Sequence, residues 1–208
     1  MTLNVLVACE ESQAVTKQFR ALGHNAYSCD LLNSSGGNPE WHIKGDAIQI
    51  AYDSSYNWDL MIAHPPCTYL SNAGARWLYP KGILNENRYK KGLKAKEFFM
   101  KLLNAPIDKI CVENPLPSKI FNLPKHNQVI QPYQFGEPYS KKTLLWLKNL
   151  PLLKHTDVVD NYKTYLPSNT GGKKRGQSYR FVSINKIDSS KTFKGIAKTI
   201  ANQWSKEL

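Results

Sequence analysis

The chain has 208 residues, of which 41% are hydrophobic and 21% are charged, an ordinary composition for one globular domain with its own core. It has no apolar run near 18 residues and no signal-peptide pattern, so the sequence predicts neither a membrane span nor export. The four cysteines include no C-x-x-C pair, which argues against a metal site and a disulfide framework and favours a reducing cytoplasm.

The formal net charge of +12 is unevenly distributed along the chain. Residues 1–114 carry 12 Lys and Arg and 11 Asp and Glu, whereas residues 115–208 carry 16 and 5. A one-sided basic surface is typical of proteins that bind a polyanion. A basic surface can also serve solubility alone, but the asymmetry favours a nucleic-acid partner.

The first half alternates predicted strands and helices. Short runs rich in Val, Ile and Leu indicate strands, and apolar residues at helical spacing indicate helices. In chain order, the expected elements are a strand at 3–8, a helix at 13–22, strands at 26–29 and 60–63, a helix at 88–104 and a strand at 109–112. A strand–helix–strand order predicts parallel neighbouring strands.

The second half has a different pattern. Residues 128–135 and 142–148 alternate like the two strands of a hairpin, and residues 193–204 form a closing amphipathic helix. Between them, residues 161–191 are polar and basic, and Gly171–Gly176 is expected to be a flexible loop. The sequence therefore predicts one domain over 1–208, a doubly wound, mostly parallel α/β sheet with a late antiparallel hairpin.

Three residues with reactive or charged side chains follow predicted strands. Asp30, Cys67 and Glu113 each come just after a buried strand. Ligands bind at the carboxyl edge of an open α/β sheet, so we expect these side chains to share one crevice. There, Asp30 can accept hydrogen bonds from the ribose of a nucleoside-bearing cofactor, and Asp46 offers a second acceptor. Both aspartates can equally be ordinary turn residues.

Three motifs resemble those of one enzyme family. They are Pro65-Pro66-Cys67 with Leu70-Ser71-Asn72-Ala73-Gly74, Glu113-Asn114-Pro115, and Gly136-Glu-Pro-Tyr-Ser-Lys141-Lys142-Thr143. In this order they resemble the Pro-Cys loop, the Glu-Asn-Val element and the Gly-x-Pro strand of the cytosine-C5 methyltransferases. The likeness covers roughly residues 3–150 and is closest to small, phage-type members.

The resemblance implies a covalent mechanism for methylating DNA. Cys67 would attack carbon 6 of a flipped cytosine, because a thiolate is a strong nucleophile and carbon 6 is inaccessible in a stacked base. Glu113 would contact N3 and the exocyclic amine, and Lys141 would hold the base or a phosphate. Carbon 5, then nucleophilic, would take the methyl group of S-adenosylmethionine. Lys141 can also be simple basic surface.

The same resemblance implies that S-adenosylmethionine is held by residues at the strand ends: Cys9, Glu10, Asp30, Leu31, Asp46, His64 and Pro65. The loop at residues 8–13 differs from the family because it contains no glycine. Glu10 or Glu11 there would repel the carboxylate of the cofactor while holding its ammonium group. Cys9, Cys29 and Cys111 can equally be packing residues.

The basic second half is the expected DNA-binding surface. Residues 152–191 stand where the family has a larger target-recognition region, and the candidate contacts are Lys142, Lys173, Lys174, Arg175 and Arg180. Two alternatives remain open: the same chemistry on a free pyrimidine nucleotide or single-stranded nucleic acid, and a non-catalytic DNA-binding or host-interaction protein. We expect a monomer without a membrane partner, and a protein partner could assist target recognition.

Overall fold

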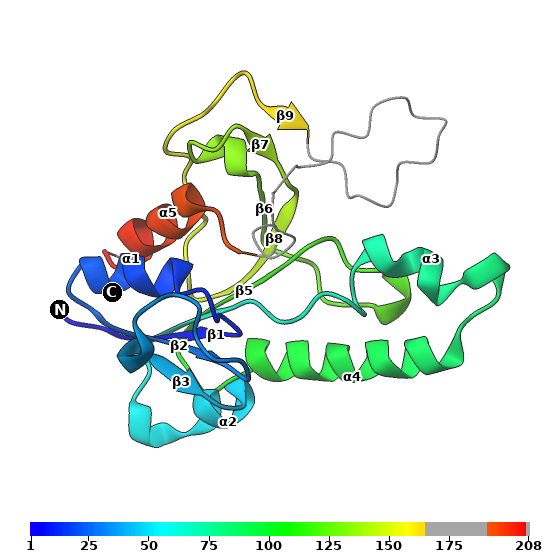
Figure 1. Cartoon of the computed structure of the whole chain (residues 1–208), viewed down its shortest axis with the longest axis horizontal. Coiled ribbons are helices and arrows are strands. Elements are labelled where there is room, and N and C mark those ends of the chain that lie inside the picture. The colour runs from blue at the N-terminus through cyan, green and yellow to red at the C-terminus, as the bar shows by residue number, and fades with distance from the viewer. Residues whose placement is uncertain (165–190, 207–208) are drawn as a thin grey trace.

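A computed structural model describes residues 1–164 and 191–206 (Figure 1). Its centre is a seven-stranded sheet in the order β3-β2-β1-β4-β5-β8-β6. The strands are β1 (Asn4–Ala8), β2 (Asn25–Asp30), β3 (His42–Lys44), β4 (Leu60–Ala63), β5 (Lys109–Asn114), β6 (Gln128–Ile130) and β8 (Thr143–Lys148). The five strands from β3 to β5 are parallel, and β8 runs antiparallel to both of its neighbours.

Helices cover both faces of this sheet. α1 (Ala14–Ala21) and α5 (Lys194–Trp204) pack together on one face, and α2 (Ala47–Tyr52) and α4 (Glu86–Leu103) lie on the other. Alternation along β1 explains the two layers, because successive side chains point to opposite faces. Val5 and Val7 join the core under α1 and α5, and Leu6 and Ala8 join the core over α2 and α4. The predicted doubly wound α/β fold is confirmed.

The predicted hairpin differs in detail from the observed structure. β6 and β8 pair antiparallel, with Gln128 opposite Leu145, but β6 ends at Ile130 and a 3-10 turn follows at Pro132–Gln134. Pro132 has no N–H to donate to a ladder, so the strand cannot continue through it. The chain then forms β7 (Tyr139–Ser140), which pairs with β9 (Lys163–Thr164) in a separate two-stranded sheet.

Two further boundaries differ from expectation. β5 continues through Asn114, which pairs with Leu144. Glu113 is therefore the second-last residue of the strand and does not follow it. Residues 71–87, for which no helix or strand is predicted above, contain the short helix α3 (Ala75–Leu78) and two 3-10 turns. The predicted Gly171–Gly176 loop lies outside the described residues. Within residues 1–164 and 191–206, no helix combines the length and apolarity needed to cross a membrane.

Candidate active site

The loop that carries Cys67 leaves the sheet directly after β4. The His64 amide donates to the Ala8 carbonyl at 2.9 Å, which extends the ladder by one residue. Pro65 and Pro66 have no amide hydrogen, so the chain must turn away from the sheet there. The Cys67 carbonyl then accepts hydrogen bonds from the amides of residues 70 and 71, at 3.1 and 2.8 Å. These bonds fix Cys67 at the start of a tight turn.

This loop is joined to the segment that follows β5. Asn114, which is 1% exposed, donates from Nδ2 to the Pro65 carbonyl at 3.0 Å. Two backbone hydrogen bonds, of 2.8 and 2.7 Å, join residues 70–72 to residues 116–118. The Cys67 loop and the end of the Glu113 strand are therefore held together by three bonds and form one structural unit.

Glu113 pairs with a histidine that the sequence alone does not mark as its partner. His64 Nδ1 lies 3.1 Å from Glu113 Oε2, and the two side chains are 12% and 26% exposed. Burial lowers the pKa of His64, but the hydrogen bond and charge of Glu113, together with the charge of Glu10, outweigh it and raise that pKa. Burial raises the pKa of Glu113, but His64 and the charge of Lys141 outweigh it and lower that pKa. Each partner thus favours the charged form of the other.

The register of the sheet explains this pairing. β4 and β5 are parallel with Ala63 opposite Val112, so the next residues, His64 just after β4 and Glu113 within β5, lie side by side. His64 was expected to be a cofactor contact, and its second ring nitrogen, Nε2, is buried without a hydrogen-bond partner among the described residues. A buried polar atom of this kind normally has a partner, so Nε2 is a candidate ligand contact.

Cys67 is half-buried and close to the same charged groups. Burial and the negative charge of Glu113 raise the pKa of its thiol, and the positive charge of Lys141 partly opposes them. The structure therefore brings Cys67, Glu113 and Lys141 into one electrostatic neighbourhood. In the free protein Cys67 is a protonated thiol.

A narrow pocket lies beside His64 and Glu113, between the sheet and α5, and Cys67 is not among the residues that line it. His64, Glu113, Lys141 and Thr143 form its polar side, and apolar residues that include Phe193 line the other side. Lys141 Nζ lies 5.7 Å from the centroid of the Phe193 ring. Segments far apart in the sequence thus share one pocket.

The loop after β1 has a conformation that suits glycine better than the residues it contains. Cys9 has a φ of 60°, a left-handed conformation that costs side-chain-bearing residues energy. Glu10 is 4% exposed and caps α1: its carboxylate accepts from the Val15 amide at 2.7 Å and from the Thr16 hydroxyl at 2.7 Å. A carboxylate at a helix N-terminus is favourable. Glu10 therefore has a structural role that the sequence does not reveal.

The other predicted cofactor residues lie at the ends of β2 and β3. Asp30 is the last residue of β2, and Asp46 caps α2 by accepting from the Ile48 amide at 2.8 Å. Burial, followed by the charges of Asp30, Cys29 and Asp46, raises the pKa of Cys9, so these side chains cluster. Leu31, beside them, is 71% exposed. The predicted cofactor residues thus form two neighbouring groups. The first is Cys9, Asp30, Leu31 and Asp46, and the second is His64 and Pro65.

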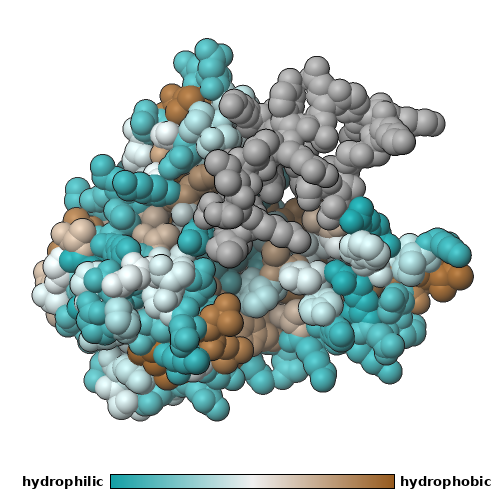
Figure 2. Space-filling model, in the orientation of Figure 1, coloured by the Kyte–Doolittle hydropathy of each residue, from teal (hydrophilic) through white to brown (hydrophobic). Residues whose placement is uncertain are grey.

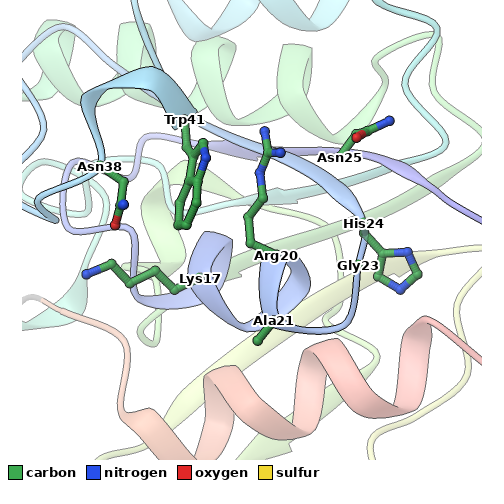
Figure 3. A pocket seen from close by; sticks show the side chains of 8 residues that line it. All are labelled: Lys17, Arg20, Ala21, Gly23, His24, Asn25, Asn38 and Trp41. Carbon is green, nitrogen blue, oxygen red and sulfur yellow. The ribbon is translucent and has the colours of Figure 1, made fainter.

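A wider hollow on the outer side of α1 contains none of the predicted site residues (Figure 3). Its central side chain is Arg20, which lies beside Trp41 with the guanidinium 5.3 Å from that ring and 4.6 Å from the ring of Tyr27. Arg20 Nε also donates to the Ala26 carbonyl at 2.7 Å. Because none of the predicted catalytic residues lines it, this hollow is not the candidate active site.

The predicted nucleic-acid contacts are only partly within the described structure. Lys142 is exposed just before β8. Lys173, Lys174, Arg175 and Arg180 lie outside the described residues. Among the residues that the structure describes, no group of three or more His, Cys, Asp and Glu side chains is arranged to hold a metal ion.

Comparisons with known proteins concern the fold. No family model and no curated protein matches the sequence. A protein assigned as a DNA modification methyltransferase, encoded within an E. coli prophage, is similar over 70% of this chain and 46% of its own, with 10% identity and a TM-score of 0.43. The Entamoeba histolytica methyltransferase EhMeth is similar over 79% and 58%, with 18% identity and a TM-score of 0.45.

The S. pombe Dnmt2 methyltransferase is similar over 73% of this chain and 51% of its own, with 15% identity and a TM-score of 0.43. The chain spans about half the length of the three structures. The mostly parallel seven-stranded sheet with helices on both faces is itself a doubly wound, Rossmann-like arrangement.

Proposed function

We propose that the protein is an S-adenosylmethionine-dependent DNA cytosine-C5 methyltransferase with Cys67 as its nucleophile. The observation that carries this proposal is the joining of the Cys67 loop to the end of the Glu113 strand, through Asn114 and the backbone bonds beside it. Lys141 supports it, because its charge acts on both the thiol and the carboxylate. A nucleophile and a carboxyl group on one rigid unit can contact two edges of one pyrimidine ring.

The His64–Glu113 pair supplies the proton that the addition needs. When Cys67 Sγ bonds to carbon 6, the C5=C6 electrons shift to C5=C4 and those of C4=N3 move onto N3, which takes a proton. His64 Nδ1 lies 3.1 Å from Glu113 Oε2, so in this mechanism the imidazolium passes a proton to Glu113, which passes it to N3. After methylation N3 returns this proton to Glu113, a water molecule takes the proton of carbon 5, and the electrons of that C–H bond form C5=C6 as the thiolate leaves.

Glu113 also couples substrate binding to the state of Cys67. Its negative charge is one cause of the raised pKa of the thiol. While Glu113 itself holds the proton that it passes to N3, this charge is neutralised, and the pKa of Cys67 falls at that stage. Lys141 favours the thiolate in the same way. The nucleophile is thus activated in the complex and protected in the free protein.

The strand ends fit the nucleoside part of S-adenosylmethionine. Asp30 and Asp46 provide carboxylates for ribose hydroxyls, and exposed Leu31 provides an apolar surface beside them. Glu10 differs from the usual arrangement, because it already fills the N-terminus of α1. When bound, the cofactor supplies an electrophilic methyl group. Cys9, His64 and Pro65 complete the proposed contacts.

DNA is the proposed substrate, as a duplex from which the target base is flipped. The one domain over 1–208 would carry residues 152–191 as a basic substitute for a target-recognition region, with Lys142, Lys173, Lys174, Arg175 and Arg180 at phosphates. We place the protein in a reducing cytoplasm, where Cys67 stays a thiol. It would act as a monomer, with or without a partner for target recognition.

A covalent trap tests the proposal. DNA that contains 5-fluorocytosine cannot lose a proton from carbon 5, so with cofactor the enzyme should form an adduct that survives denaturation. Cys67→Ser should form none. Cys29→Ser is the matched control, because the Cys29 thiol donates to the Gly45 carbonyl and a hydroxyl can replace it. An adduct that persists in Cys67→Ser would exclude this nucleophile.

Glu10 supports a second candidate, a non-catalytic DNA-binding or host-interaction protein. Its carboxylate fills the N-terminus of α1, beside the proposed cofactor site, and would repel the cofactor's own carboxylate. Calorimetry with S-adenosylhomocysteine separates the two functions. Binding supports the methyltransferase, and DNA binding without cofactor binding supports the second candidate.

A further inference from the structure

The segment that follows Cys67 carries a concentrated positive charge that the count over the first half conceals. We call residues 68–94 the arm; it contains α3 and the first half of α4. Within it the only acidic residue is Glu86, and the basic residues are Arg76, Lys81, Arg88, Lys90, Lys91 and Lys94. The arm extends away from the central sheet, and its visible surface is largely hydrophilic (Figures 1 and 2). It is a locally basic surface next to the proposed nucleophile.

Aromatic side chains are interleaved with these cations. Trp77 is 55% exposed, and the Arg76 guanidinium lies 4.7 Å from its ring. Arg88 and Lys91 lie 5.0 and 5.7 Å from the ring of Tyr69. Arg88 and Lys91 share one side of α4 because they are three residues apart. The arm thus presents flat rings and positive charges together.

These side chains surround a hollow of about 320 Å³, lined by Tyr69, Trp77, Asn85, Asn87, Arg88 and Lys91. The hollow is connected to the Cys67 loop, because Arg88 Nη2 donates to the Thr68 carbonyl at 2.7 Å. Gly74 permits this bond: a Cβ there would lie 2.7 Å from Arg88 Nη2. The lining residue nearest to Cys67 in the sequence is Tyr69, two residues after it.

Exposed rings beside cations are the arrangement that binds unpaired nucleotides, because bases stack on the rings and phosphates pair with the cations. We propose that the arm binds unpaired nucleotides of the substrate strand, with Tyr69 and Trp77 as stacking surfaces and Lys91 at a phosphate. The inference rests on the proposed function only for the position of the target base beside Cys67. Strand binding by the arm stands independently of catalysis.

Titration with oligo-dT, without cofactor, tests the arm. Binding should quench tryptophan fluorescence, and Trp77→Phe should remove most of the quenching while preserving affinity. Trp77→Ala should weaken binding about 5- to 150-fold, the effect of losing one stacked base. Lys91→Ala should reduce the slope of log affinity against log salt by about 0.7. Tyr52→Ala and Lys44→Ala are matched controls on α2 and β3, since both residues are exposed, and should change neither quantity.

Three results would overturn the inference. They are unchanged affinity in Trp77→Ala, equal losses in Trp77→Ala and Tyr52→Ala, and competition by polyglutamate as effective as that by oligo-dT. Cys67→Ser should bind oligo-dT like the unmodified protein, so this assay is independent of the covalent trap. A failed trap with intact arm-dependent binding would reject the methyltransferase and keep the arm. The reverse result would reject the arm alone.

Discussion

Glu113→Gln should destabilise the protein in a pH-dependent manner, because it removes the carboxylate of the His64–Glu113 pair. A hydrogen bond to a charged group contributes about 1.5–3 kcal/mol. Glutamine retains one neutral acceptor, and water screens Glu113, which is 26% exposed. We therefore expect the free energy of unfolding to fall by about 1–2 kcal/mol where both partners are charged.

The sign of the pH dependence follows from the two shifted pKa values. The raised pKa of His64 gives stability that is complete below its ordinary value of 6.5 and is lost as pH rises through the folded value. The lowered pKa of Glu113 gives stability that is complete above its ordinary value of 4.5 and is lost as pH falls through the folded value. The difference between the two proteins should therefore be largest between pH 4.5 and 6.5.

Urea unfolding from acid to alkaline pH measures this difference, and NMR titration of the imidazole measures the pKa of His64. In Glu113→Gln that pKa should fall below its ordinary value, because burial and Lys141 lower it and only Glu10 remains to raise it. Glu97→Gln is the control: Glu97 forms an exposed ion pair with Lys101, so its substitution should change stability less than Glu113→Gln does. An unchanged His64 titration, or a loss of stability independent of pH, would refute the reasoning.

Three further substitutions test the packing that positions the site. Glu10→Ala removes the cap of α1 and should cost about 1–2 kcal/mol in urea unfolding; a cost no greater than that of Glu97→Gln would contradict the capping role. Gly92→Ala places a Cβ against the ring of Phe121, so it should destabilise by about 1–2 kcal/mol despite the better helix propensity of alanine; a stabilised protein would show that the ring moves freely. Asn114→Ala leaves the buried Pro65 carbonyl without its donor. It should lower the free energy of unfolding by about 1–3 kcal/mol and make the Cys67 loop more sensitive to protease. Unchanged proteolysis would contradict the joining of this loop to the end of β5.

The central strands could be predicted because burial on both faces leaves a continuous apolar run, as in Leu60–Ala63. α2 and β3 were missed, since six and three residues carry too little periodicity. The one available signal for α2 is Asp46, which the sequence suggests as a cofactor contact or a turn residue and which caps the helix in the structure.

The contacts of His64 and Glu10 could not be predicted from the sequence, because they depend on strand register and on a turn conformation. The strand-end rule identified Cys67 and Glu113 from local pattern alone. The partnership of His64 and Glu113 depends on the register of β4 against β5, which hydrophobic pattern does not determine between two fully buried strands. The role of Glu10 depends on a turn with Gln13 in the left-handed region, which directs the carboxylate back at α1. The positive charge of the arm was missed, because charge was counted over residues 1–114, where acidic residues outside the arm offset it.

The position of α5 determines when, during folding, the pocket beside Glu113 is complete. The pocket beside Glu113 is walled by residues near 64, 113, 141 and 193, and contacts between such distant segments form late because each requires a large loop to close. A chain folded only through β5 would hold His64 and Glu113 without the other walls of this pocket. The pocket is therefore complete only when α5 packs beside this pair.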